Sequence, residues 1–154
     1  MSLGFGLCDF VAIPALAWKV YKACKASSEE FRAVATDVAS LHVVLKETED
    51  YVSERSAGLG ADREAQLAIL GKGCREILQD LERLLIRYDG LDTQSQRTWD
   101  RMKWGLEDIG TARQRLLTST SMLTAFNMNL IQYVSNNPTC ESRNCADGAQ
   151  VLSS

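Results

Sequence analysis

The sequence predicts an all-α protein, a bundle of four to five antiparallel helices with an apolar N-terminal helix and a polar C-terminal tail. Apolar residues recur at alternating intervals of three and four over long stretches, which is the spacing of one helix face. Only two prolines occur, and Ala, Leu, Arg, Glu and Lys dominate, a composition that favours helix over strand. At 154 residues the chain fits a single domain with its own core. We assign the bundle to residues 1–134 and a linker or disordered tail to residues 135–154.

The first predicted helix contains an awkward proline. Its apolar face steps by three and four residues: Phe10, Ile13, Ala17, Val20 and Cys24. Pro14 lacks an N–H group and crowds the preceding turn. Either the regular helix begins near Pro14, with residues 3–12 as a looser arm, or the helix is kinked there. Both alternatives predict that the first dozen residues are weakly held.

The second predicted helix opens at Ser27 and Glu30, which have the spacing of a capping box, and continues to about Arg55. Gly58 and Gly60 are stop signals after it. Its expected core face is Phe31, Val34, Val38, Leu41, Leu45, Thr48 and Val52.

Asp62 can cap a third helix, which ends at Asp89-Gly90. Its expected core face is Leu67, Leu70, Cys74, Ile77, Leu81, Leu84 and Tyr88.

The last helical stretch starts at Thr93 and Gln96, again with capping-box spacing. Its apolar face begins as Trp99, Met102, Leu106 and Ile109, and then slips in phase. It continues as Ala112, Leu116, Ser119, Leu123, Phe126, Leu130 and Tyr133. Because Gly105 and Gly110 flank the slip, we expect a bend near 105–110 or two successive helices. The same three-four spacing permits coiled-coil packing between subunits, so self-association as a dimer or higher oligomer is expected.

The charge distribution points away from nucleic acid. The net charge is −3, and a nucleic-acid binder needs a basic face. Residues 1–25 nevertheless hold three lysines against Asp9 alone, a local charge of +2. A basic, apolar leading segment on an acidic body suits an anionic lipid surface or an acidic partner. Solvated lysines on a helix edge explain the same pattern.

The residues that carry chemistry are sparse, so we predict no enzyme activity, no cofactor and no metal. His42 is the one histidine and is expected at the core boundary. The sequence has no glycine-rich phosphate loop and no Glu-x-x-His motif. An odd number of cysteines in a long helical chain indicates reduced thiols and a cytosolic protein. The apolar stretch from Leu3 to Trp18 is shorter than the roughly 20 residues of a spanning helix.

Several packing motifs together resemble one family. They are Phe5-Gly6-x-x-Asp9-Phe10, Ala17-Trp18-x-x-Tyr21-Lys22-x-Cys24-Lys25, Glu30-Phe31, Leu41-His42-x-Val44-Leu45, Lys103-Trp104-Gly105-Leu106-Glu107-Asp108-Ile109, Arg113-x-x-Leu116 and Leu123-x-x-Phe126. Over residues 3–133 the chain resembles the fungal HeLo-like N-terminal helical domains of NOD-like receptors and cell-death proteins. These domains are similar to plant coiled-coil resistance domains.

The resemblance implies a membrane-targeting domain for cell-death execution or signalling, of the fungal heterokaryon-incompatibility or innate-immunity type. Such a domain oligomerises, and its N-terminal helix engages the membrane. The inserting positions would be Leu3, Phe5, Leu7, Phe10, Val11 and Ile13. The positions at lipid headgroups would be Trp18, Lys19, Lys22 and Lys25. The implied partners are anionic membrane lipids, further copies of the chain and a NOD-like receptor.

The location implied by the same resemblance is the cytoplasm, with movement to the inner face of the plasma membrane on activation. The alternative hypothesis is a helical adaptor or oligomerisation module at the N-terminus of a larger receptor, without lipid affinity.

Overall fold

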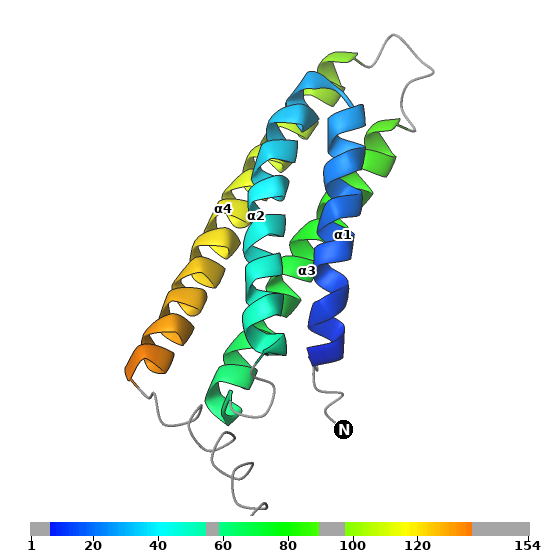
Figure 1. Ribbon diagram of the computed structural model, residues 1–154. Coiled ribbons are helices and arrows are strands. Elements are labelled where there is room, and N and C mark those ends of the chain that lie inside the picture. The colour runs from blue at the N-terminus through cyan, green and yellow to red at the C-terminus, as the bar shows by residue number, and fades with distance from the viewer. Residues whose placement is uncertain (1–6, 55–58, 90–97, 137–154) are drawn as a thin grey trace, which may run out of the picture.

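A computed structural model describes residues 7–54, 59–89 and 98–136, and these form four helices (Figure 1). They are α1 (Leu7–Ala26), α2 (Glu29–Ser53), α3 (Ala61–Asp89) and α4 (Thr98–Asn136). The described ranges contain no strand, so the prediction of an all-α bundle is confirmed, with four helices rather than five. The proposed tail lies almost entirely outside the described residues.

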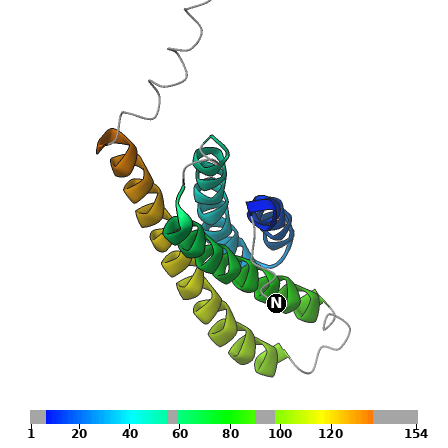
Figure 2. The same ribbon diagram turned by 90° about the horizontal axis from the view of Figure 1, so that it is seen from below.

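The helices pack in a ring in which α1 and α4 lie on opposite sides. Helix α1 packs against α2 and α3, and α4 packs against the same two helices from the other side (Figures 1 and 2). Helices that follow each other in the chain run in opposite directions (Figure 1). Helices α1 and α4 are therefore separated from each other by α2 and α3.

The core is built from the predicted apolar faces. In α2 all seven predicted positions are buried, together with Ala35. In α3 the inner face shifts by one residue toward its end, since Leu78 and Leu85 are buried while Leu84 is half-buried and Tyr88 is exposed. A strict seven-residue repeat drifts by about 20° per heptad on a straight helix. Three heptads of drift bring the neighbouring residue to the inner side.

The expected looseness of α1 before Pro14 is wrong for residues 10–13. The helix begins at Leu7 and runs through Pro14, which is itself buried. Phe10 is 1% exposed and Ile13 is 0% exposed, and the Arg75 guanidinium donates a hydrogen bond to the Asp9 carbonyl at 3.0 Å. Burial and this cross-helix bond hold the turn that the proline weakens. The sequence shows the local cost of the proline but not the distant contacts that offset it.

Two predicted helix boundaries also need correction. Ser28, not Ser27, precedes the first turn of α2, and it makes no side-chain capping hydrogen bond, so the Ser27–Glu30 capping box is wrong. Helix α4 is continuous over 39 residues, so two successive helices are wrong as well. A phase slip moves the apolar face around the helix without breaking a backbone hydrogen bond. The cost of Gly105 and Gly110, about 1 kcal/mol each, does not interrupt so long a helix. The expected Thr93–Gln96 start lies outside the described residues.

The buried cysteines give a first prediction. Burial raises the pKa of the Cys24 thiol to about 11 and that of the Cys74 thiol to about 12. Because the thiolate is the reactive form, we expect neither thiol to react with a disulfide reagent at pH 8 in the folded protein. The measurement uses a Cys8→Ser/Cys140→Ser/Cys145→Ser variant, with and without denaturant.

The same pKa shifts predict a pH dependence. Both folded-state pKa values lie above the ordinary 9.0, so folded protein binds the thiol protons more tightly than unfolded protein does. The free energy of unfolding should be unaffected below pH 9 and fall as the pH rises from 9 through about 12. Rapid labelling of Cys24 in native protein at pH 8 would show that α1 leaves the bundle readily.

Candidate functional site

Helix α1 divides the predicted membrane residues between two faces. Phe10 and Ile13 lie in the core, as fully buried as Leu81 of α3. Val11 is 51% exposed and Trp18 is 47% exposed on the opposite, outward side. The six predicted inserting positions therefore do not form one surface: Leu3, Phe5 and the Leu7 side chain lie outside the description, and only Val11 of the others faces solvent.

The outward side forms a defined surface, which we call the α1 outer face: Val11, Ala15, Trp18, Lys22 and Lys25. All five side chains are exposed. They recur at intervals of four, three, four and three residues, so they lie along one side of the helix. The N-terminal part of this face is apolar and its C-terminal part is basic.

Trp18 is held in place although it is half exposed. Its ring stacks on Tyr21 at a centroid distance of 5.1 Å and lies 5.4 Å from the His42 ring of α2. The Lys25 Nζ lies 5.8 Å from the centre of the Tyr21 ring. His42 is half-buried at this α1–α2 boundary, as predicted. These contacts fix the orientation of the half-exposed indole.

The charges on α1 are one-sided. From Phe10 to Ala26 the helix has three lysines and no acidic residue. Lys19 pairs with Glu82 of α3 at 2.7 Å, whereas no ion pair of the described residues involves Lys22 or Lys25. The predicted headgroup residues are thus brought together on one helix, with one of their charges compensated.

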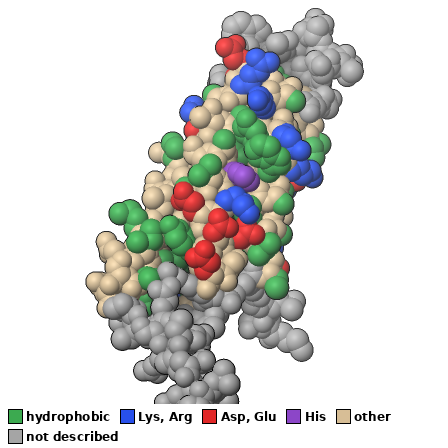
Figure 3. All heavy atoms as spheres, viewed as in Figure 1, with side chains coloured by type: hydrophobic (Ala, Val, Ile, Leu, Met, Phe, Trp, Pro, Cys, Tyr) green, Lys and Arg blue, Asp and Glu red, His purple; other side chains and the backbone are tan. Residues whose placement is uncertain are grey.

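Acidic residues gather at the opposite end of the same side of the molecule. Glu47, Asp50 and Glu54 are exposed on the C-terminal half of α2, which runs beside the N-terminal half of α1. Figure 3 shows most acidic side chains below His42 and most basic side chains above it, although a basic side chain also lies directly below the histidine. A negatively charged surface would therefore be attracted by the C-terminal end of α1 and repelled by the C-terminal end of α2.

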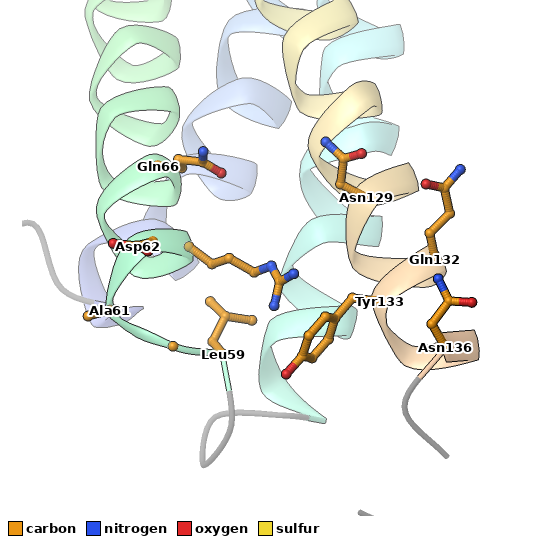
Figure 4. Close-up of a pocket in the computed structure, with 10 residues that line it drawn as sticks. Leu59, Ala61, Asp62, Gln66, Asn129, Gln132, Tyr133 and Asn136 are labelled. Carbon is orange, nitrogen blue, oxygen red and sulfur yellow. The ribbon is translucent and has the colours of Figure 1, made fainter. Parts of the chain in front are cut away.

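A second feature is a cleft of about 600 Å³ between the start of α3 and the end of α4 (Figure 4). The Arg63 guanidinium lies 3.8 Å from the centre of the Tyr133 ring, and the amides of Asn129, Gln132 and Asn136 line the wall on α4. Among the described residues that line it there is no cysteine, serine or histidine, and Asp62 supplies a carboxylate. The described part of the chain also contains no cluster of His, Cys, Asp or Glu that could hold a metal ion.

A third feature lies on α4 and was not predicted from the sequence. From Leu116 to Asn136 there is no charged residue, although much of this segment faces solvent. Leu117, Met128 and Ile131 are all about half exposed there. The uncharged run is visible in the sequence, but the prediction for this helix concerned only its core-facing residues.

None of the helices in the described ranges is long and apolar enough to cross a bilayer. Comparison of the chain with family models, with curated proteins and with solved structures gave no match.

Proposed function

We propose that this bundle is a membrane-targeting signalling domain of the cell-death type that its sequence resembles, and that it docks on anionic membranes through the α1 outer face. One observation carries the proposal: a half-exposed, ring-stacked Trp18 stands beside two lysines without ion pairs, on a helix side without acids. Tryptophan and lysine are the residues that suit the headgroup region of a bilayer.

The energetics favour docking by the upper end of α1. Each lysine near an anionic surface contributes about 1 kcal/mol. Lys22 and Lys25 supply this attraction, while Glu47 and Asp50 are repelled, so the bundle tilts with its basic end toward the lipid. The cytoplasmic leaflet of the plasma membrane is the anionic one. A cytoplasmic protein that moves to this leaflet on activation fits these charges.

Deep insertion of α1 is a separate, later step in this proposal. Releasing the helix exposes Phe10, Ile13 and Val20, which are buried in the bundle. Large apolar side chains of this kind contribute roughly 1.5–3 kcal/mol each when buried. A bilayer returns a similar free energy only after the helix has reached it, so docking precedes release. Deleting residues 1–13 would remove core side chains and is a poor test of lipid binding.

Charge removal on the α1 outer face is the better experiment. We expect wild-type protein to float with vesicles that contain phosphatidylserine and not with neutral vesicles. Lys22→Gln/Lys25→Gln should weaken binding roughly 30-fold, because two contributions of about 1 kcal/mol are lost. The measurement is vesicle flotation over a lipid titration at about 0.1 M salt.

The matched control is Lys72→Gln/Arg87→Gln, which makes the same change in net charge on α3. Both side chains are exposed there. The control should bind as the wild type does. Equal weakening by the two variants would mean that only the total charge matters, and wild-type binding by Lys22→Gln/Lys25→Gln would refute docking by this face.

The uncharged outer side of α4 favours a second candidate function, a helical adaptor or oligomerisation module within a larger receptor. It predicts a stable dimer or partner complex with no affinity for either kind of vesicle. Flotation and molecular-mass measurement on the same preparation separate the two candidates.

A further inference from the structure

We infer that the outer side of α4 is a self-association surface on which a second copy of this chain packs antiparallel. The surface, which we call the α4 seam, consists of Leu117, Ser121, Thr124, Met128 and Ile131. This inference does not rest on the proposed membrane function, because the α1 outer face and the α4 seam belong to different helices, which lie on opposite sides of the bundle (Figure 2).

The α4 seam is marked first by its lack of charge. The 21 residues from Leu116 to Asn136 include no Asp, Glu, Lys or Arg, whereas the longest such run in the other three helices is nine residues. A chain of net charge −3 repels its own copies least where it is uncharged. Covering this surface also removes no charge from water, which is the costly part of burying a polar surface.

The spacing of the α4 seam is that of a helix-pairing face. Its residues step by four, three, four and three, the seam pattern of two packed helices. Leu117, Thr124 and Ile131 each follow a core residue, namely Leu116, Leu123 and Leu130, so the seam lies about 100° around the helix from that core line. The large side chains Leu117, Met128 and Ile131 are between 46% and 56% exposed, far from the burial that apolar residues of this size usually reach.

The small residues at the centre are already satisfied within the helix. The Ser121 hydroxyl donates to the Leu117 carbonyl at 2.9 Å, and the Thr124 hydroxyl donates to the Thr120 carbonyl at 2.8 Å. Because these donors have partners, a second helix can cover them without stranding a polar group. Their small size lets two helices approach closely at the middle of the seam.

Charge complementarity selects the antiparallel arrangement of two copies. The last turn of α4 has no basic residue, so no side-chain charge within it offsets the negative end of the helix dipole. In an antiparallel pair centred on Thr124, Leu117 lies beside Ile131 of the second copy. The same register places Arg113 beside the last turn of the second copy.

Arg113 has donors to spare for this role. Its Nε donates to Asp37 of α2 at 2.7 Å, and a guanidinium carries further N–H groups. A parallel pair would instead bring two negative helix ends together. The antiparallel pair is symmetric, with the same patch used by both copies, as in most homodimers.

Sedimentation equilibrium of the full chain under reducing conditions, without lipid, tests the inference. We expect a concentration-dependent dimer. Thr124→Glu places two carboxylates at the symmetry centre and should weaken the dimer at least 30-fold, leaving the helix content by circular dichroism unchanged. Thr118→Glu adds the same charge on an exposed side of α4 outside the seam, and should dimerise as the wild type does.

Cross-linking tests the direction of the pair, in a background with Cys8, Cys140 and Cys145 changed to Ser. Thr124→Cys should form a disulfide dimer on mild oxidation, because Thr124 meets its own copy. Leu117→Cys should not, because the two positions lie about 20 Å apart in an antiparallel pair, while a disulfide needs Cα atoms within about 7 Å.

Three results would overturn the inference: a monomer at every concentration up to 0.2 mM, equal loss of dimer in the two glutamate variants, or equal cross-linking at positions 117 and 124. The last of these indicates a parallel pair. Loss of vesicle binding in the Lys22→Gln/Lys25→Gln variant, with the dimer intact, leaves the two surfaces distinguishable.

Discussion

Replacing Phe10 by alanine is expected to lower the free energy of unfolding by about 3–5 kcal/mol, whereas Val11→Ala should change it by less than about 0.5 kcal/mol. The two residues are neighbours on α1, and they differ in burial: Phe10 is 1% exposed and Val11 is 51% exposed. Removing the buried ring leaves a cavity that the surrounding helices fill only in part. Removing two exposed methyl groups leaves none.

Urea unfolding followed by circular dichroism measures both changes, with equal slopes required for a valid comparison. The pair of variants decides whether the beginning of α1 belongs to the bundle or is a loosely held arm. Similar small effects at positions 10 and 11 would contradict the docked helix and restore the loose arm that the sequence predicted. Such a result would also lower the expected cost of releasing α1 to a membrane.

The second large effect is expected at Asn127, where two substitutions should change the free energy of unfolding very differently. Asn127 is buried between α2 and α4, its Nδ2 has no hydrogen-bond partner among the described residues, and its Oδ1 lies 2.9 Å from the Thr48 hydroxyl. That hydroxyl also lies 2.7 Å from the Val44 carbonyl, and its single proton serves one acceptor at a time. The pair is therefore only partly satisfied.

Asn127→Asp should cost about 3–5 kcal/mol at pH 7, because it places an unpaired carboxylate in the core. Asn127→Leu should be neutral or stabilising, because it removes an unpartnered donor and fills the same space. Burial raises the pKa of an introduced carboxyl above its unfolded value. The Asp variant is therefore least destabilised below the unfolded pKa, near pH 4, and loses stability as the pH rises above it.

Unfolding at pH 4 and pH 7 measures these differences. A neutral effect of Asp at pH 7 would mean that water reaches position 127. A large loss with Leu would mean that the Thr48–Asn127 contact specifies how α2 meets α4, beyond its own modest energy.

The helices and most of their inner faces follow from local patterns. The spacing of Phe31, Val34, Val38 and Leu41 in α2 predicts which residues are buried, because a helix places every third or fourth side chain on one side. The same reasoning found most of the core of α4 between Ile109 and Leu130, but Ser119 is half-buried and Tyr133 is exposed. The side chains of the predicted Trp99, Met102 and Leu106 lie outside the description. The reasoning was wrong where distant contacts outweighed a local cost, as in the turn before Pro14, where Arg75 donates a hydrogen bond to the Asp9 carbonyl across 66 residues.

The candidate surfaces were predicted less completely. The sequence predicts that Lys19, Lys22 and Lys25 act together. In the structure Lys19 pairs with Glu82, and the sequence does not reveal this contact between α1 and α3. By sequence alone, Phe10 and Val11 are equally suited to membrane insertion, because both are apolar. Their division between core and surface follows from which side of α1 meets α2 and α3.

The sequence by itself determined a helical bundle and most of the buried face of each helix, because helix periodicity is a property of neighbouring residues. Only the tertiary structure decided that α1 and α4 lie on opposite sides of the bundle, and that Thr48 meets Asn127 across 79 residues. All four inner faces are apolar and almost interchangeable as patterns. The choice among their pairings depends on the fit of side chains that are far apart in the chain.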